Sequence, residues 1–226
     1  MSTQLVEASV DQFSIGGCKA SVSSNINGSQ VSCPTASDGS VTANASGGTG
    51  AYTFQWGPRA ANQTGPVATG LSTIGGPYCV TVTDANLCST TASVTITEPS
   101  AITITSSVTS DYNGSDISCN GVCDGELTAN AIGGTGTITY DWGAATGNQT
   151  TAVATAICDG VYTVIATDAN GCTVSSAVTI TEPSAVSASA TSTLVSCNSG
   201  TDGTATAIGS GGIGSYTFAW DNNASN

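Results

Sequence analysis

The chain has 226 residues, of which 39% are hydrophobic and 8% are charged, a composition too apolar for a disordered protein. Its formal net charge of −13 repels nucleic-acid phosphates and anionic headgroups, so nucleic acid is not an expected partner. It has no histidine, the usual general base and zinc ligand, and no apolar run of about 18 residues, so we expect neither an enzyme nor direct membrane insertion.

Residues 1–30 are predicted to form an N-terminal strand segment. They start without the basic and apolar regions of a signal peptide. The stretches at 5–11 and 16–23 resemble a divergent copy of the last two strands of the repeats that follow. We therefore interpret residues 1–30 as a possible donor that completes a half-domain.

Internal repeats organise the rest of the chain. Three similar segments run from a cysteine-containing motif to a tryptophan, at 31–56, 117–142 and 195–220. The stretches at 78–100 and 162–184 also match each other, whereas nothing comparable follows the third tryptophan. The predicted domains are repeat 1 at 31–107, repeat 2 at 108–190 and the front half of repeat 3 at 191–226.

Each repeat has the pattern of β-structure. Apolar and polar residues alternate in Val41–Ala45, Tyr52–Trp56 and Val80–Thr83, which indicates half-buried strands. Gly-Gly-x-Gly runs mark the turns, and a single tryptophan in the third strand suits an immunoglobulin-like core. We predict an all-β protein of tandem immunoglobulin-like β-sandwich repeats joined by Glu-Pro-Ser linkers. The incomplete third repeat would expose apolar faces and a bare strand edge, so something must complete it.

The motifs, in order, resemble a known family. Cys-Asn-Gly-x-Cys-Asp-Gly, Gly-Gly-Thr-Gly, Tyr-x-Phe/Tyr-x-Trp, Thr-Asp-Ala-Asn-Gly-Cys and Val-Thr-Ile-Thr-Glu-Pro are similar to the SprB-type repeat over residues 31–226. That family occurs in long cell-surface adhesins of gliding bacteria and in related secreted proteins. The resemblance implies a secreted or cell-surface location and a role in adhesion or fibre building, with no reaction.

The nine cysteines predict disulfides. The resemblance implies a bond from the leading cysteine of each repeat to the cysteine of its Thr-Asp-Ala-Asn motif, which gives Cys33–Cys88 and Cys119–Cys172. Repeat 2 has two further cysteines, Cys123 and Cys158, that repeat 1 lacks at those positions, and we expect them to pair. Cys79 is the candidate for an unpaired cysteine, buried in a strand.

The remaining two cysteines suggest an assembly. Cys197 leads repeat 3, and Cys18 lies in the segment that resembles final strands. We predict a structural subunit of an extracellular filament, assembled head to tail as a homopolymer by strand complementation and linked through Cys18–Cys197. The alternatives are a fragment of a long multi-repeat surface adhesin, a cis Cys18–Cys79 pair, or a glycan-binding module that stacks surface sugars on Tyr52 or Trp56.

Two further residue types mark surface features. Asn-x-Ser/Thr motifs predict a glycoprotein, with the better candidates at matching places in repeats 1 and 2; the candidates are Asn62, Asn148, Asn27, Asn44, Asn113 and Asn223. Acidic residues recur at fixed positions, and turn formation is favoured over calcium binding because no dense Asp-x-Asp run occurs; these residues are Asp38, Asp124, Asp202, Asp84, Asp168, Glu98 and Glu182. No other cofactor is expected.

Overall fold

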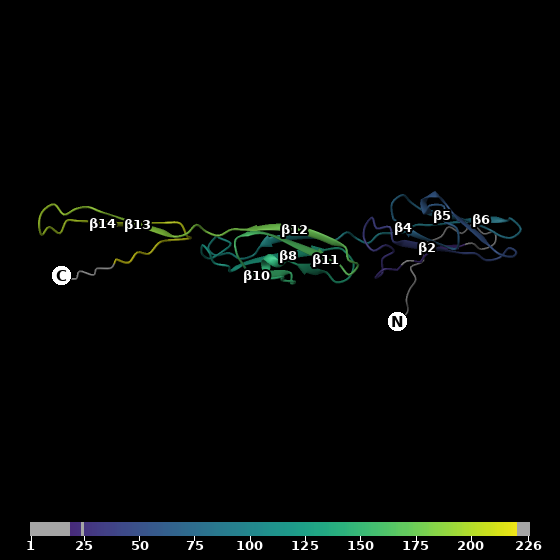
Figure 1. Ribbon diagram of the computed structural model, residues 1–226, viewed down its shortest axis with the longest axis horizontal. Coiled ribbons are helices and arrows are strands. Elements are labelled where there is room, and N and C mark those ends of the chain that lie inside the picture. The colour runs from purple at the N-terminus through teal and green to yellow at the C-terminus, as the bar shows by residue number, and fades with distance from the viewer. Residues whose placement is uncertain (1–18, 24, 221–226) are drawn as a thin grey trace. The chain divides into compact units, whose positions relative to one another are not determined.

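The computed structural model describes residues 19–23 and 25–220, and this part of the chain contains strands, turns and two short 3-10 helices but no α-helix (Figure 1). The all-β prediction is confirmed. The elements of repeat 1 are β1 (Lys19–Val22), β2 (Gly39–Asn44), β3 (Thr53–Trp56), η1 (Pro58–Ala60), β4 (Val67–Leu71), β5 (Tyr78–Thr83) and β6 (Ser89–Val94).

Repeat 2 has the same elements in the same order, and repeat 3 has the first two. Those of repeat 2 are β7 (Thr103–Val108), β8 (Gly125–Ile132), β9 (Thr139–Asp141), η2 (Ala144–Thr146), β10 (Val153–Ile157), β11 (Gly160–Thr167) and β12 (Thr173–Ile180). Repeat 3 contributes β13 (Ser187–Ser192) and β14 (Ala205–Ser210).

Each complete repeat contains two three-stranded sheets. The sheet orders are β1-β2-β4 and β3-β5-β6 in repeat 1, and β7-β8-β10 and β9-β11-β12 in repeat 2. The pairs β1–β2, β3–β5, β5–β6 and β13–β14 are antiparallel, and β13 pairs with β14 as β1 pairs with β2. The first, second and fourth strands therefore form one sheet, and the third, fifth and sixth form the other.

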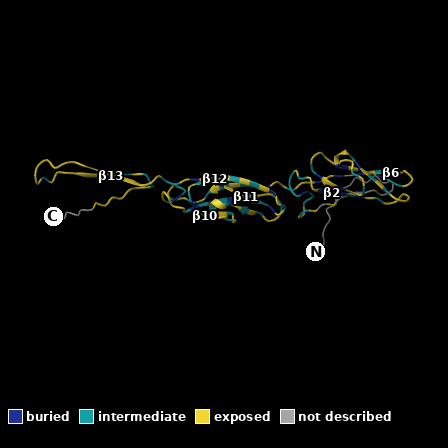
Figure 2. Cartoon of the chain, in the orientation of Figure 1, coloured by how far each residue is buried: buried dark blue, intermediate teal, exposed yellow. Residues whose placement is uncertain are grey.

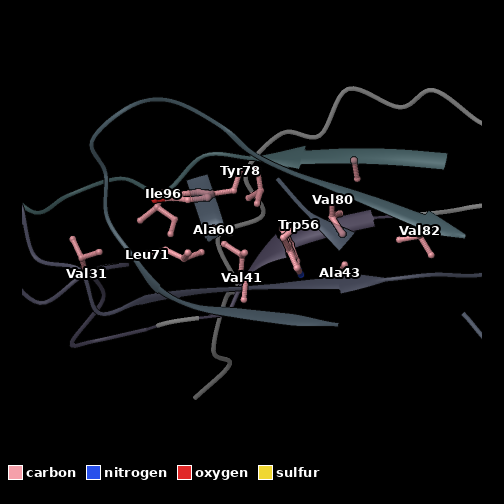
Figure 3. Packing of buried hydrophobic residues seen from close by; sticks show 13 residues of the cluster. Val31, Val41, Ala43, Trp56, Ala60, Leu71, Tyr78, Val80, Val82 and Ile96 are labelled. Atoms are coloured by element: carbon pink, nitrogen blue, oxygen red, sulfur yellow. The ribbon is translucent and has the colours of Figure 1, made fainter. Parts of the chain in front are cut away.

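The core of repeat 1 lies between its sheets because apolar side chains alternate with polar ones along the strands. In β5 the residues alternate buried and exposed, starting from Tyr78. Val41 of one sheet and Trp56 and Val80 of the other point into the same interior (Figure 3). The Trp56 indole Nε1–H donates to the carbonyl of Gly65 at 3.0 Å, so the ring is buried with its polar atom satisfied.

The described chain divides into two compact units that do not follow the repeat boundaries. The first comprises Met1–Ile104, Ala131–Thr139 and Ala166–Val174, as far as these residues are described. The second comprises Thr105–Asn130, Tyr140–Ile165 and Ser175–Asn226, with the same restriction. Two loops of repeat 2 thus belong to the unit that contains repeat 1.

The structure corrects the prediction of a donor segment for part of residues 1–30. Lys19–Val22 is the first strand of repeat 1, where Lys19 pairs with Asn44 and Val22 with Val41. The edge of β2 is thus paired with the preceding strand of its own chain. In the later repeats, β7 pairs with β8 and β13 pairs with β14 in the same way. Residues 1–18 lie outside the described residues, so a donor role for them stays a prediction.

Repeat 3 is open, as the sequence predicts. β13 is exposed along its whole length (Figure 2). Residues 215–220, which match β3, form no strand. In the complete repeats this third strand pairs only with the fifth strand, and the described part of repeat 3 has no fifth strand. The predicted exposed apolar face is therefore present.

Candidate functional site

The most distinctive site is a disulfide that links two repeats within the first unit. Cys33 of repeat 1 is bonded to Cys172 of repeat 2, with an S–S distance of 2.05 Å and a Cα–Cα distance of 5.7 Å. It involves three short segments. We call residues 32–38 the leading turn, residues 25–29 the asparagine loop and residues 168–172 the head loop.

The leading turn holds Cys33 in a fixed conformation. The backbone N–H of Ser32 donates to Asp38 Oδ1 at 3.0 Å, and the carbonyl of Cys33 accepts from the N–H of Ala36 at 3.0 Å. Hydrogen bonds from the Ser32 side chain and backbone hold the pKa of Asp38 below its usual value. The aspartate is a turn former here, as the sequence predicts.

The head loop is organised around Asp168. Its Oδ1 accepts from the N–H groups of Asn170 and Cys172, both at 2.9 Å, and its Oδ2 accepts from the N–H of Thr135 at 2.8 Å. Thr135 lies in the glycine turn 133–136. A Cβ on Gly134 would lie 3.0 Å from the Asp168 carboxylate, so a glycine is needed for this close approach. The carboxylate thus ties the head loop, which carries Cys172, to the glycine turn.

The asparagine loop supplies polar contacts around the disulfide. Asn27 Nδ2 donates to Asn170 Oδ1 at 2.7 Å and to the carbonyl of Ala169 at 3.3 Å. Asn170 Nδ2 donates to the carbonyl of Ser32 at 2.9 Å, next to Cys33. We call the disulfide and these contacts the joint. The amide of Asn27 is engaged in the joint, which disfavours a sugar at that candidate.

Two of the predicted disulfide pairings are wrong. Cys88 and Cys119 are exposed and have no disulfide partner among the described residues, and Cys33–Cys172 replaces both Cys33–Cys88 and Cys119–Cys172. The physical reason is distance within one repeat. Cys33 precedes β2, whereas the N–H of Ala85 donates to Thr49 O beyond the far end of β2. β2 alone spans roughly 20 Å, far beyond the Cα separation of about 6 Å that a disulfide requires.

The other cysteines give mixed outcomes. The Cys123–Cys158 bond is confirmed. Cys79 has no disulfide partner among the described residues, and it is exposed rather than buried as predicted, because it lies on the outer face of β5. Cys197 is free within the described chain. Cys18 lies outside the described residues, so Cys18–Cys197 and Cys18–Cys79 are untested.

The head loop of repeat 1 and the leading turn of repeat 2 have the same local structure as the corresponding segments of the joint. In repeat 1, Asp84 Oδ1 accepts from the N–H groups of Asn86 and Cys88, both at 2.9 Å. In repeat 2, the N–H of Ser118 donates to Asp124 Oδ1 at 3.1 Å. Residues 84–88 are therefore a second head loop, and residues 118–124 are a second leading turn.

The other predicted surface sites have less structural support. Trp56 is buried and cannot stack on a sugar, which leaves Tyr52 beside an open cavity of about 450 Å³ that Phe54 also lines. Asn62, Asn148, Asn44 and Asn113 are exposed, and Asn223 lies outside the described residues. No group of three metal-ligating side chains occurs in the described residues, and calcium binding is untested.

The carboxylates of the turns predict a pH dependence. Hydrogen bonds lower the pKa of four of them below the ordinary value of 3.8; they are Asp38, Asp84, Asp124 and Asp202. A carboxylate whose pKa is lowered in the folded state stabilises the fold at pH values above its ordinary pKa. This stabilisation is lost as the pH falls through the folded-state pKa. We expect a melting temperature that is level from about pH 8 to pH 5 and falls below about pH 4. A fall that begins above pH 5 would contradict this assignment.

Asn170→Ala should weaken the joint. It removes the hydrogen bonds to Ser32 and Asn27, at about 1 kcal/mol each, so the equilibrium constant for forming Cys33–Cys172 in a glutathione buffer should fall roughly thirtyfold. The bonded fraction can be measured by mass spectrometry of trapped thiols. Asn86→Ala, at the matching position of the free head loop, is the control and should leave the constant unchanged; equal effects would contradict the role of Asn170.

The comparisons with known proteins agree with this architecture. A family model described as SprB repeat matches residues 25–60, 112–147 and 189–225. Each match covers the front half of a repeat: it begins in the first strand or in the loop that follows this strand, and it extends beyond the tryptophan. No curated protein matches the chain. None of the helical segments in the described residues is long and apolar enough to cross a bilayer. The chain therefore carries three SprB repeats, the repeat found in cell-surface, adhesin-type proteins.

Proposed function

We propose that the chain is a structural subunit of an extracellular filament, in which copies join head to tail and strands from the next copy complete repeat 3. In this role it catalyses no reaction, and its main partner is a second copy of itself. The sequence-level alternative, a long multi-repeat adhesin, differs in one respect: the strands that complete repeat 3 would come from the same polypeptide.

The observation that carries the proposal is the exposed apolar face of repeat 3. Trp220 is 52% exposed, whereas the matching Trp56 and Trp142 are 0% and 2% exposed. Val195 is 49% exposed, whereas the matching Val31 is fully buried. Soluble proteins rarely leave such a set of core residues in water. Two strands that play the part of β5 and β6 would bury it.

Backbone pairing supports the same conclusion. In the complete repeats, the third strand has one neighbour, the fifth strand, and the fifth also pairs with the sixth. Strands supplied from outside would pair with residues 216–220 and bury Trp220 at the same time. Strand addition of this kind combines main-chain hydrogen bonds with side-chain pockets. Head-to-tail contacts that do not close produce filaments.

The proposal can be tested on the purified full chain. We expect polymers to appear with rising concentration in sedimentation velocity and electron microscopy, with hydrogen-exchange protection appearing at residues 205–220. A chain that stays monomeric, with those residues unprotected, would contradict it. A synthetic peptide of residues 160–184, which holds β11 and β12, is then the informative addition. Binding to the monomer with a blue shift of tryptophan fluorescence would favour completion by a continuing chain.

A further inference from the structure

We infer that Cys197 of one copy forms a disulfide with Cys88 of the next copy, so that the joint between repeats 1 and 2 recurs between copies. This inference rests on the head-to-tail assembly proposed above. It differs from the Cys18–Cys197 pairing expected from the sequence, and it uses two exposed thiols that have no partner among the described residues.

The observed disulfide supplies the pairing rule. Cys33–Cys172 connects the leading cysteine of one repeat to the head-loop cysteine of the following repeat. Cys197 is the leading cysteine of repeat 3. In a head-to-tail assembly, the repeat that follows is repeat 1 of the next copy, whose head-loop cysteine is Cys88.

The leading turn of repeat 3 is already formed. The N–H of Ser196 donates to Asp202 Oδ1 at 3.0 Å, the same distance as from Ser32 to Asp38 in the joint. The carbonyl of Cys197 accepts from the N–H of Gly200 at 2.9 Å, as the carbonyl of Cys33 accepts from Ala36. Cys197 is therefore held by the same turn as the bonded Cys33, although the second half of repeat 3 is missing from the described residues.

The head loop of repeat 1 is formed as well. Asp84 accepts from the N–H groups of Asn86 and Cys88 at the distances found for Asp168 with Asn170 and Cys172. Asp84 Oδ2 also accepts from the N–H of Thr49, at 3.0 Å. Both halves of the proposed bond thus have the backbone arrangement that they have in the joint, and neither must refold to form it.

The front half of repeat 3 contains most of what the joint uses. On the repeat 1 side, the side-chain contacts across the joint come from residues 26–33, before β2. Repeat 3 keeps the leading turn, so Asn86 could donate to the carbonyl of Ser196 as Asn170 donates to that of Ser32. In repeat 1 the asparagine loop lies between Ser23 and Val31, whereas in repeat 3 only Leu194 lies between the matching residues Thr193 and Val195. Repeat 3 therefore has no counterpart of Asn27. We therefore expect the bond between copies to be reduced more easily than Cys33–Cys172.

Cys119 is the other free leading cysteine, but its position is blocked for a second copy. It is followed in the chain by repeat 3, whose Gly212 N–H donates to the carbonyl of Ser184 at 2.7 Å. Gly134 and Ser100 make the same contact at 3.1 Å, beside the head loop of repeat 2. The glycine turn of repeat 3 thus already occupies the place that another head would take. Cys119 is left for the strands that complete repeat 3.

The bond requires an oxidant, because two thiols lose two electrons and two protons when they join. A small-molecule or enzyme-held disulfide can accept them: the Cys88 thiolate attacks it and releases one thiol, and the Cys197 thiolate then attacks the mixed disulfide and releases the second. The net change is one protein disulfide formed and one oxidant disulfide reduced. Such oxidants operate outside the cytoplasm, where disulfides persist.

A pair of variants tests the bond on the full chain, with glutathione disulfide as the oxidant. The wild type should give a ladder of covalent multimers on a non-reducing gel, with a Cys88–Cys197 peptide in its digest. Cys88→Ser and Cys197→Ser should each remain a single band. Their equimolar mixture should stop at a covalent dimer, because it has one Cys197 and one Cys88 to join. Cys79→Ser and Cys119→Ser are the controls and should keep the ladder.

The outcomes separate this inference from the proposed function. Filaments in electron micrographs without a covalent ladder, or a ladder that survives in Cys88→Ser or Cys197→Ser, would overturn the bond and leave the filament standing. A wild type that neither polymerises nor forms a ladder would overturn both. Circular dichroism of the variants checks their folding, which should be unchanged because both cysteines are exposed and free.

Discussion

Pulled from its two ends, the oxidised chain should extend as if the residues between Cys33 and Cys172 were absent. The disulfide joins residues 139 positions apart, so force passes through the sulfur atoms and bypasses the segment between them. At roughly 3.5 Å per extended residue, about 490 Å of contour length is withheld. Reduction should release it, and single-molecule force spectroscopy measures the difference directly.

Two variants make this measurement specific. Cys33→Ser should release most of the hidden length without a reductant, but the Cys123–Cys158 bond still closes 35 residues, about 120 Å. Cys79→Ser removes a free thiol and should extend like the wild type. If oxidised and reduced chains gain the same length, or if Cys33→Ser behaves like Cys79→Ser, the Cys33–Cys172 bond does not carry the load.

This arrangement has a consequence for a surface fibre. A bond within one repeat would protect that repeat alone and leave the linker to the next repeat as the path of force. The joint instead spans the Glu-Pro-Ser linker and includes all of repeat 2 up to Cys172 in one covalent loop. If the bond between copies forms as inferred, the same device bridges each contact between subunits, and the filament resists tension without requiring large hydrophobic cores.

The sequence was sufficient to predict the sandwich and its open third repeat. Strand alternation, the Gly-Gly-x-Gly turns and the tryptophan of the third strand each have a local physical cause, and each repeats in register along the chain. The Cys123–Cys158 pair was also accessible, because these are the two cysteines that repeat 2 adds to the pattern of repeat 1. These features depend on residues that lie close together within one repeat.

The pairing of Cys33 could not be read from the repeat pattern. Each complete repeat has one leading cysteine and one head-loop cysteine. A leading cysteine could therefore bond to the head-loop cysteine of its own repeat or to that of the following repeat, and the repeat pattern is the same in both cases. Only the direction of the strands separates the two cases. Cys33 precedes β2 and Cys88 follows β5, and both strands run toward the head loop, which places these cysteines at opposite ends of the repeat.

The role of residues 19–22 was ambiguous for a similar reason. A short Lys-Ala-Ser-Val stretch has the alternation of any edge strand, so it resembled a final strand as well as a first one. The number of residues between a cysteine and the next strand would have separated the two interpretations. In the complete repeats, β6 or β12 and a linker separate the head-loop cysteine from the next first strand, whereas Cys18 directly precedes β1.

Replacing two matching tryptophans by alanine should separate stability from assembly: Trp142→Ala should lower stability, and Trp220→Ala should weaken assembly. Trp142 is buried in repeat 2, and its Nε1–H donates to the carbonyl of Thr151 at 3.0 Å. Trp142→Ala should therefore lower the free energy of unfolding of repeat 2 by about 3–5 kcal/mol. Trp220 is half exposed in the open repeat 3, so Trp220→Ala should leave the free energy of unfolding of the monomer nearly unchanged.

In the proposed assembly this order should reverse, because a strand from a second copy would bury Trp220 when it completes repeat 3. We expect Trp220→Ala to raise the concentration needed for polymerisation, while its urea unfolding curve as a monomer overlays that of the wild type. Hydrogen exchange during the urea titration assigns the loss in Trp142→Ala to repeat 2. A Trp220→Ala chain that polymerises as readily as the wild type would mean that the exposed face of repeat 3 is not the contact between subunits.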